Sequence, residues 1–252
     1  MKVTHFLHIL NNERNRSKSF GRFDLGEVMN TIAKIKTDFP TKFGIPRQSG
    51  LVEELKGTII FEPTYRNADA IRGLEDFSHI WLIWKFSTGV TESWSPTVRP
   101  PKLGGNTKVG VFASRSPFRP TSLGLSSVKL EKIEYSEKYG PILHVAGADL
   151  MDNTSIVDIK PYVPYSDCHT DATGGFSQDG SSQLLKVDVS ERMITVIPEE
   201  KRDALIKVLE LDPRPAYQDD ENRVYGFGFA GCEVKFTVSG GTLYVREIIK
   251  TE

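Results

Sequence analysis

Short strand-like runs separated by turn residues are the feature of this chain that most restricts its fold. Between Thr31 and Tyr165 the runs rich in β-branched or aromatic residues are 58–61, 79–86, 108–112, 126–130, 142–146 and 155–159. Gly, Pro and Asn clusters separate them, and only residues 67–74 resemble a helical turn. Many short strands without strand–helix alternation predict a barrel or sandwich rather than a doubly wound fold.

The last third of the chain has a different pattern. Residues 168–182 are rich in Gly, Ser and Asp, which predicts a linker or loop. A strand-like run at 184–189 and a helical pattern at 199–211 follow, and residues 232–238 and 242–249 predict a final hairpin. We therefore expect a mainly β protein. It should comprise an extension at 1–28, a β-barrel domain at 29–167 and a small α+β domain at 168–252.

Composition indicates an ordinary globular protein. The 252 residues are 38% hydrophobic and 26% charged, with a formal net charge of −1. This balance excludes nucleic-acid binding through overall charge, so any RNA affinity must come from local patches. No run approaches the roughly 18 apolar residues of a membrane span. The apolar run at 5–10 is broken by histidines and does not resemble a signal peptide, so we expect a cytoplasmic protein.

The cysteines and histidines predict neither a disulfide framework nor a metal site. The only two cysteines are Cys168 and Cys232, which we expect to be buried or half-buried free thiols. The five histidines form no H-E-x-x-H or comparable cluster, so no metal is expected. The glycine-rich run 226–231 fits G-x-G-x-x-G, but no helix pattern follows it, which argues against a nucleotide role.

A rigid cationic loop is the strongest functional signal. Residues 114–126 contain two arginines, two prolines and four serines, with no helix or strand period. They lie within residues 93–130, which contain six Lys or Arg residues and no Asp or Glu. A polar, locally cationic loop of this kind suits an anionic or carboxylate-bearing ligand.

Five segments, in order along the chain, resemble the TrmO family of tRNA methyltransferases. They are 44–51 (GIPRQSGL), 70–84 (AIRGLEDFSHIWLIW), 99–106 (RPPKLGGN) with the 114–126 loop, 149–162 (DLMDNTSIVDIKPY) and 212–217 (DPRPAY). The resemblance implies a dimeric β-barrel enzyme that binds S-adenosylmethionine near the subunit interface. It also implies methylation of the exocyclic N6 of threonylcarbamoyladenosine, beside the anticodon of threonine tRNA, and hence contact with the anticodon arm.

The resemblance also implies a set of cofactor-binding residues. Arg115 is the first candidate for the methionine carboxylate, and Arg47 is a second. Asp149 is expected to accept from the adenine amine or the ribose while Leu150 packs on the purine, although a turn-capping aspartate is an alternative. The predicted cofactor-binding residues are Pro46, Arg47, Gln48, Ser87, Thr88, Arg115, Gly124, Leu125, Gly147, Ala148, Asp149 and Leu150.

Four further residues are predicted to bind RNA. Lys102 and Arg119 lie in the acid-free segment, and Arg214 and Tyr217 lie near the end of the resemblance. Arg214 and Tyr217 are expected to pair with or stack on bases, or alternatively to pack between domains. The sequence does not divide Arg47, Arg115 and Arg119 between cofactor carboxylate and RNA phosphate, and it identifies no catalytic residue.

The chain departs from the family pattern at three places. Thr121 replaces the usual Asn, Ser87 and Thr88 stand where a His often follows the Trp-rich strand, and residues 151–154 read Met-Asp-Asn-Thr instead of Leu-Asp-Gly-Thr. The loss of the Asn and the His supports one alternative, a non-catalytic module that binds S-adenosylmethionine or RNA. We expect Trp81 and Trp84 to lie in the core, with at most one on each face of the strand available for stacking.

Overall fold

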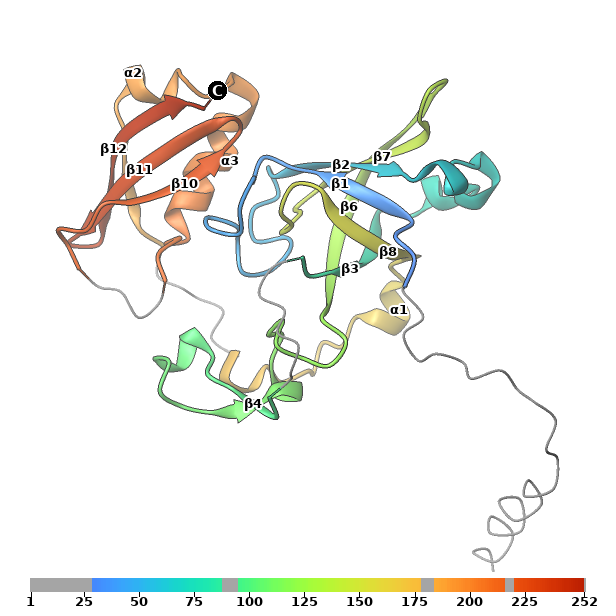
Figure 1. Ribbon diagram of the computed structural model, residues 1–252, viewed down its shortest axis with the longest axis horizontal. Helices are drawn as coiled ribbons and strands as arrows, with labels where there is room; N and C mark the ends of the chain where they lie inside the picture. Colours follow the sequence, from blue (N-terminus) through green and yellow to red (C-terminus); the bar gives the residue numbers. More distant parts are fainter. Residues whose placement is uncertain (1–28, 88–94, 178–183, 216–219, 252) are drawn as a thin grey trace, which may run out of the picture. The chain divides into compact units, whose positions relative to one another are not determined.

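Six strands close into a barrel in the computed structural model of the protein (Figure 1). The structure describes residues 29–87, 95–177, 184–215 and 220–251, and residues 31–252 form one unit. The barrel order is β1-β2-β7-β6-β3-β8, and every neighbouring pair is antiparallel. Its strands are β1 (Ala33–Lys36), β2 (Lys56–Phe61), β3 (His79–Lys85), β6 (Leu123–Ser136), β7 (Gly140–Ala146) and β8 (Thr154–Pro161).

Alternation of side chains along these strands produces the barrel core. On β3, Ile80 and Leu82 are fully buried, as are Ile35 on β1 and Leu143 on β7. Successive side chains of a strand point to opposite faces, so the residues between them lie on the outer face or near the barrel ends. Closure pairs β1 with β8, with Ala33 opposite Ile156, and leaves this sheet without free edges.

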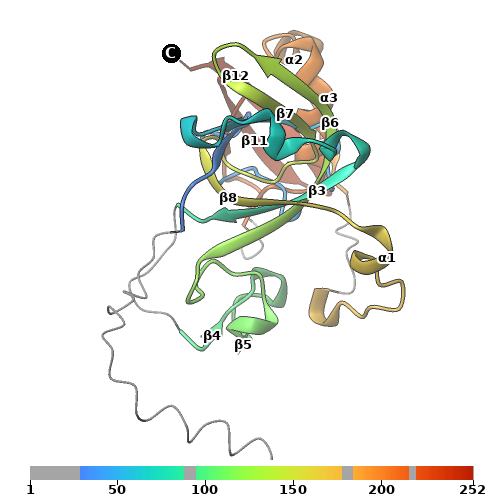
Figure 2. The same cartoon turned by 90° about the vertical axis from the view of Figure 1, so that its right-hand side faces the viewer.

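A two-stranded element and short helices interrupt the barrel strands. β4 (Thr97–Val98) pairs with β5 (Val109–Gly110), and α1 (Pro164–Asp167) directly follows β8 (Figure 2). The 3-10 helices are η1 (Pro63–Tyr65), η2 (Ala68–Ile71), η3 (Leu74–Asp76), η4 (Pro101–Leu103), η5 (Val111–Ala113) and η6 (Gly175–Ser177). The expected helical turn at 67–74 is confirmed as η2, which the Asn67 side chain caps through the Asp69 amide.

The C-terminal residues form a four-stranded sheet covered by helices (Figure 1). The order is β10-β11-β12-β9, with β9 parallel to β12 and the other pairs antiparallel. The elements are β9 (Lys186–Asp188), α2 (Glu191–Ile194), α3 (Glu199–Glu210), β10 (Tyr225–Phe229), β11 (Cys232–Ser239) and β12 (Thr242–Lys250). The predicted fold class, a β-barrel followed by a small α+β part, is confirmed.

The structure corrects several sequence-based expectations. The run at 108–112 is a two-residue strand that pairs outside the barrel, followed by a 3-10 turn. The sequence missed β1, which is only four residues long, and β10, whose alternating glycines hid its strand character. Cys168 is exposed, whereas Cys232 is buried as expected. The run 226–231 enters a turn between β10 and β11, so no helix follows it.

Candidate active site

A cavity of about 660 Å³ lies at one end of the barrel strands. Its walls come from the connection between β1 and β2, the end of β3, the 114–122 loop and the start of β6, and from residues that follow β7. Small-molecule sites typically occupy about 300–1,000 Å³ and combine apolar walls with a few polar groups. The volume and lining are therefore suited to a nucleoside-sized ligand.

Most of the predicted site residues line this one cavity, although they come from distant parts of the sequence. The cofactor-binding candidates in the lining are Pro46, Arg47, Gln48, Ser87, Arg115, Gly124, Leu125 and Asp149, and the RNA-binding candidate Arg119 lines it too. Arg115 donates a hydrogen bond to the side-chain oxygen of Gln48, so two walls of the cavity meet at this pair.

The lining is strongly cationic. Lys42, Arg47, Lys85, Arg115 and Arg119 all line the cavity, and Asp149 is the only carboxylate among the described lining residues. Cations that converge on a concave surface raise the local potential and attract anions. The arrangement favours a ligand with a carboxylate or phosphate group, and it places one acceptor carboxylate opposite these cations.

Internal hydrogen bonds hold the 114–122 loop. The Ser114 hydroxyl donates to the Val111 carbonyl (2.9 Å) and accepts from the Ser116 amide (3.3 Å). The Arg119 guanidinium donates to the Ser114 carbonyl (2.9 Å). Ser122 takes a left-handed backbone conformation (φ 44°), and its carbonyl accepts from the Phe86 amide (3.0 Å). The loop is thus ordered by its own contacts and joined to the end of β3.

A directed hydrogen-bond chain reaches Asp149. The indole N–H of Trp84, which can only donate, bonds to the Ser126 hydroxyl (3.0 Å). The single hydroxyl proton of Ser126 therefore points to Asp149 Oδ1 (2.6 Å). Burial raises the pKa of the Asp149 carboxyl above its usual value of 3.8, while the bond from Ser126 and the charge of Arg115 oppose this rise. The chain fixes the orientation of the carboxylate.

Gly124 is required by the packing of Trp84. The two residues are opposite each other in the β3–β6 pairing, and a Cβ on Gly124 would lie 2.7 Å from Trp84 Cδ2. Phe86 packs on Trp84 with ring centroids 4.4 Å apart. The glycine thus admits an aromatic pair to the cavity wall, where it offers a flat surface to a base or a cation.

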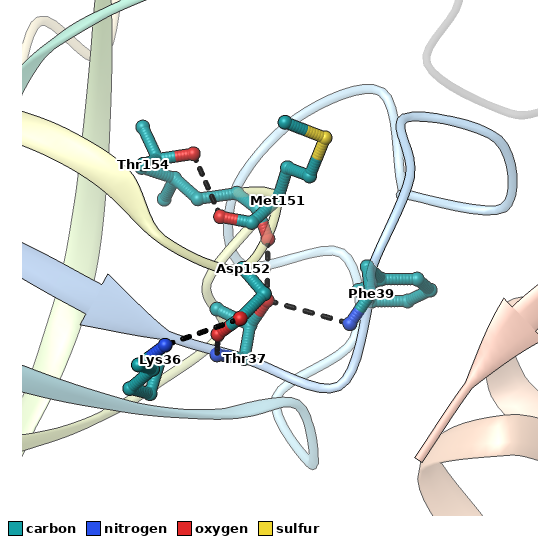
Figure 3. Close-up of polar contacts among 7 residues, drawn as sticks. Lys36, Thr37, Phe39, Met151, Asp152 and Thr154 are labelled. Carbon is teal, nitrogen blue, oxygen red and sulfur yellow. Dashed lines mark hydrogen bonds and ion pairs between the residues drawn. The ribbon is translucent and has the colours of Figure 1, made fainter. Parts of the chain in front are cut away.

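A network of polar contacts surrounds Met151 and Thr154, which line the cavity (Figure 3). Thr37 donates from its hydroxyl to the Leu150 carbonyl (2.9 Å), and its amide donates to Asp152 (3.1 Å). The Thr154 hydroxyl donates to the Met151 carbonyl (2.7 Å). Asn153, at the position where the family resemblance leads one to expect Gly, takes a left-handed φ of 64°, a conformation that Asn tolerates. This departure from the family therefore preserves the turn.

Several predicted site residues do not line the cavity. Ala148 and Leu150 are buried in the barrel core, and Gly147 binds the β1–β2 connection by accepting from the Gly50 amide (2.9 Å). Their contacts with a cofactor stay predictions. Lys102 lies in η4 outside the lining. Thr88 and Tyr217 lie outside the described residues.

Arg214 is bound within its own loop. Its guanidinium donates two hydrogen bonds of 2.8 Å to the Asp212 carboxylate, and its side chain is only 12% exposed. This geometry favours the alternative of a packing role over contact with RNA bases. The predicted RNA contact of Arg214 stays a prediction.

Several residues that line the cavity are not among the site residues predicted from the sequence. Lys85 and Trp84 end the Trp-rich strand just before the predicted Ser87, so their position was a usable signal. Lys42 and Ile45 precede the predicted Pro46, but nothing in their local sequence distinguishes them. Ser126 does not line the cavity, and only its hydrogen bonds with Trp84 and Asp149 in the folded chain connect it to the site.

In the part of the chain that the structure describes, no group of three or more His, Cys, Asp or Glu side chains is placed to hold a metal ion. Within the same residues, no helix is long and apolar enough to cross a membrane.

Both the barrel part and the C-terminal part of the chain match known protein families. The tRNA-methyltransferase O N-terminal domain family matches residues 34–168, and the TrmO C-terminal domain family matches residues 182–251. The chain belongs to the TrmO family. The resemblance seen in the sequence is thus confirmed, and the first matched range includes every described residue that lines the cavity.

Curated relatives and solved structures of the TrmO family agree with this assignment. The tRNA (adenine(37)-N6)-methyltransferase of Escherichia coli K12 is 40% identical over 199 residues, covering 75% of this chain and 83% of the relative. The enzyme of the same name from Eikenella corrodens is 42% identical over 176 residues, covering 70% and 99%. A crystal structure of TrmO from P. aeruginosa superposes with a TM-score of 0.70 at 31% identity, covering 87% of this chain and 95% of the other.

Proposed function

We propose that this protein is an S-adenosylmethionine-dependent methyltransferase that methylates N6 of adenine 37 in tRNA. Membership of the TrmO family over both matched ranges, with relatives of about 40% identity that bear this activity in their names, carries the proposal. The finer substrate, threonylcarbamoyladenosine next to the anticodon of threonine tRNA, follows from the family resemblance and is proposed with it. A homodimer is proposed on the same ground.

The residues present fit the methyl donor. S-adenosylmethionine carries a carboxylate, an ammonium, a sulfonium and an adenosine, and the cavity offers a counterpart for each kind of group. Arg115 and Arg47 are suited to the carboxylate, and the Trp84–Phe86 pair to a flat base or a sulfonium. Asp149 is suited to hydroxyl, amine or cationic groups because its orientation is fixed by Ser126. When bound, the donor supplies a methyl group attached to positively charged sulfur.

The protein contributes mainly by positioning. Methyl transfer forms a bond from the attacking nitrogen to carbon while the carbon–sulfur bond breaks, with its electron pair retained by sulfur, and the nitrogen then releases a proton. Holding the reacting atoms in line is the main demand on the chain, and such alignment can supply several kcal/mol. A strong general base is not required, which agrees with a lining that contains Asp149 but no histidine among the described residues.

The acid-free segment is suited to tRNA. Its described part, residues 95–130, contains Arg99, Lys102, Lys108, Arg115, Arg119 and Lys129 without any acidic residue. Phe112 and Phe118 are 73% and 43% exposed, and Phe118 lies between the lining residues Pro117 and Arg119. Cations next to exposed aromatic rings are the combination that binds single-stranded RNA loops. We infer that this segment receives the anticodon arm beside the cavity.

Methyl transfer from labelled S-adenosylmethionine to tRNA tests the proposal. The tRNA is taken from cells that lack this gene, and nucleoside mass spectrometry identifies the product. We expect N6-methylated threonylcarbamoyladenosine at position 37. A transcript without the threonylcarbamoyl group tests the finer substrate, and a tRNA with guanine at position 37 is the negative control. Donor binding without transfer to any tRNA would instead support the non-catalytic module.

A further inference from the structure

The C-terminal sheet contributes no side chain to the cavity, since every described lining residue lies between positions 42 and 154. The sheet nevertheless packs against residues 37–55, which we call the β1–β2 connection. Phe39, Val52 and Leu55 of this connection are buried in the apolar core of the C-terminal sheet rather than in the barrel core. The chain segment that carries Arg47 and Gln48 is therefore part of the C-terminal core.

Polar contacts fasten both ends of the connection to the C-terminal part. The Asp38 carbonyl accepts from the Ala230 amide (2.9 Å), and the Asp38 carboxylate pairs with Lys201. At the other end, Glu54 pairs with Lys207 of α3. These contacts fix the connection at its two ends, with the cavity-lining residues between them.

Gly44 packs closely against the C-terminal sheet. Its backbone has φ +90°, and the Phe227 ring fills the place of a side chain, so that an added Cβ would lie 2.8 Å from Phe227 Cγ. Ile45, the next residue, both packs against the C-terminal core and lines the cavity. Pro46, Arg47 and Gln48 follow immediately. The position of the Phe227 ring thus sets the path of the chain just before the residues proposed to bind the donor.

The opposite side of the connection is held by the barrel. Gln48 accepts a hydrogen bond from Arg115, and the Gly50 amide donates to the Gly147 carbonyl (2.9 Å). A loop held from both sides before a ligand arrives does not have to be ordered at the expense of binding free energy.

We propose that Phe227, through its contact with Gly44, positions Arg47 and Gln48, so that the C-terminal sheet determines the affinity of the cavity for S-adenosylmethionine. Phe227 is a positioning residue, because it acts through the β1–β2 connection and does not line the cavity. The proposal rests on the proposed function, since it concerns the same donor site.

Gly44→Ala tests the contact, and Gly73→Ala is its matched control. Gly73 has a similar left-handed backbone (φ +84°), but nothing lies within 4 Å of an added Cβ, and it does not line the cavity. Both variants incur the cost of a left-handed alanine, but only Gly44→Ala displaces the Phe227 ring. Binding is measured on the full chain by isothermal titration with S-adenosylmethionine, and chemical unfolding reports the folded fraction.

We expect Gly44→Ala to weaken donor binding about tenfold per folded molecule and Gly73→Ala to leave it within about twofold. A purely structural role would lower stability in both variants without changing the dissociation constant. Equal donor affinity in the two variants would overturn the inference. If the wild-type chain itself bound no S-adenosylmethionine, the proposed function would fail instead.

Phe227→Leu provides a second test if Gly44→Ala does not fold. It removes the ring from Gly44 but keeps an apolar side chain in the core, and Val238→Ala in the same core is the control for lost packing. We expect weaker donor binding in Phe227→Leu and unchanged binding in Val238→Ala. Equal donor dissociation constants in both variants would contradict the positioning role.

Discussion

The 114–122 loop and the β1–β2 connection line the same cavity, but they are supported in different ways. The loop is held mainly by hydrogen bonds within residues 111–122, such as those of Ser114 with Val111 and Ser116 and that of Arg119 with Ser114. The connection makes its supporting contacts with other elements, namely the barrel on one side and the C-terminal sheet on the other. A self-supported wall is sensitive to local substitutions, whereas a wall supported from outside is sensitive to substitutions far from the ligand.

Arg115, where the two walls meet, should show the largest effect. Arg115→Ala removes both the proposed carboxylate partner and the hydrogen bond to Gln48. Hydrogen bonds to charged groups contribute about 1.5–3 kcal/mol, so donor affinity should fall roughly 10–100-fold. Titration with S-adenosylmethionine measures this change in donor affinity, and the Michaelis constant for tRNA should change less.

Arg99→Ala is the control for Arg115→Ala, because exposed Arg99 shares the acid-free segment but does not line the cavity. Normal donor affinity with poor tRNA binding in Arg115→Ala would reverse the assignment.

Asp149→Asn should have the next largest effect, about tenfold on donor affinity, because a charged acceptor becomes neutral.

The same variant should also change how the stability of the protein depends on pH. The folded-state pKa of Asp149 is raised above its ordinary value of 3.8. Between pH 3.8 and this raised pKa, the folded state therefore binds more protons than the unfolded state. Its contribution to stability therefore falls as the pH rises through this window. Urea unfolding should show Asp149→Asn gaining stability relative to wild type from low pH towards neutral. A pH-independent difference would contradict this.

Ser114→Ala tests the self-supported wall. It removes a hydroxyl that both donates to Val111 and accepts from Ser116, at a cost of about 1 kcal/mol, and donor affinity should fall about fivefold. Ser95→Ala is the control, since Ser95 also bonds within its loop, to the Thr97 carbonyl at 2.9 Å, but does not line the cavity. If both variants bound S-adenosylmethionine equally, the internal bonds of the loop would not order the site.

Lys207→Met should show the smallest effect, because the pair of Lys207 with Glu54 is partly exposed to solvent. Such pairs contribute about 0–1 kcal/mol, so donor affinity should change less than about twofold. Lys207 lowers the pKa of Glu54 below 4.5, so the stabilisation is present at neutral pH and is lost as the pH falls through the folded-state value. Lys235→Met, which breaks the pair with Glu247 on the C-terminal sheet, is the control. A larger loss of donor affinity in Lys207→Met would mean that the contact with α3 contributes more to holding the β1–β2 connection in place.

The sequence predicted the strands of the protein better than it predicted the contacts that hold the cavity walls in place. Runs such as 79–86 and 142–146 were recognisable because their apolar residues alternate or cluster between turn signals, and the structure confirms them as β3 and β7. Arg115, Asp149 and Gln48 were identified by family resemblance, and they line one cavity. The contact of Gly44 with Phe227 was not predictable, because local patterns carry no information on which distant segments pack together. Ala148 and Leu150 show a second limit. They were predicted from the same family resemblance, which did not distinguish residues that line the cavity from residues in the barrel core.

The contact between Gly44 and Phe227 also has a consequence for the order of events during protein synthesis. Gly44 leaves the ribosome well before Phe227, which lies in β10. Contacts between segments so far apart in sequence form late and slowly. Barrel closure itself waits for Ile156 to pair with Ala33. A nascent chain whose barrel has closed therefore has the β1–β2 connection held from the barrel side alone until β10 has been synthesised, and the proposed donor site is complete only after that.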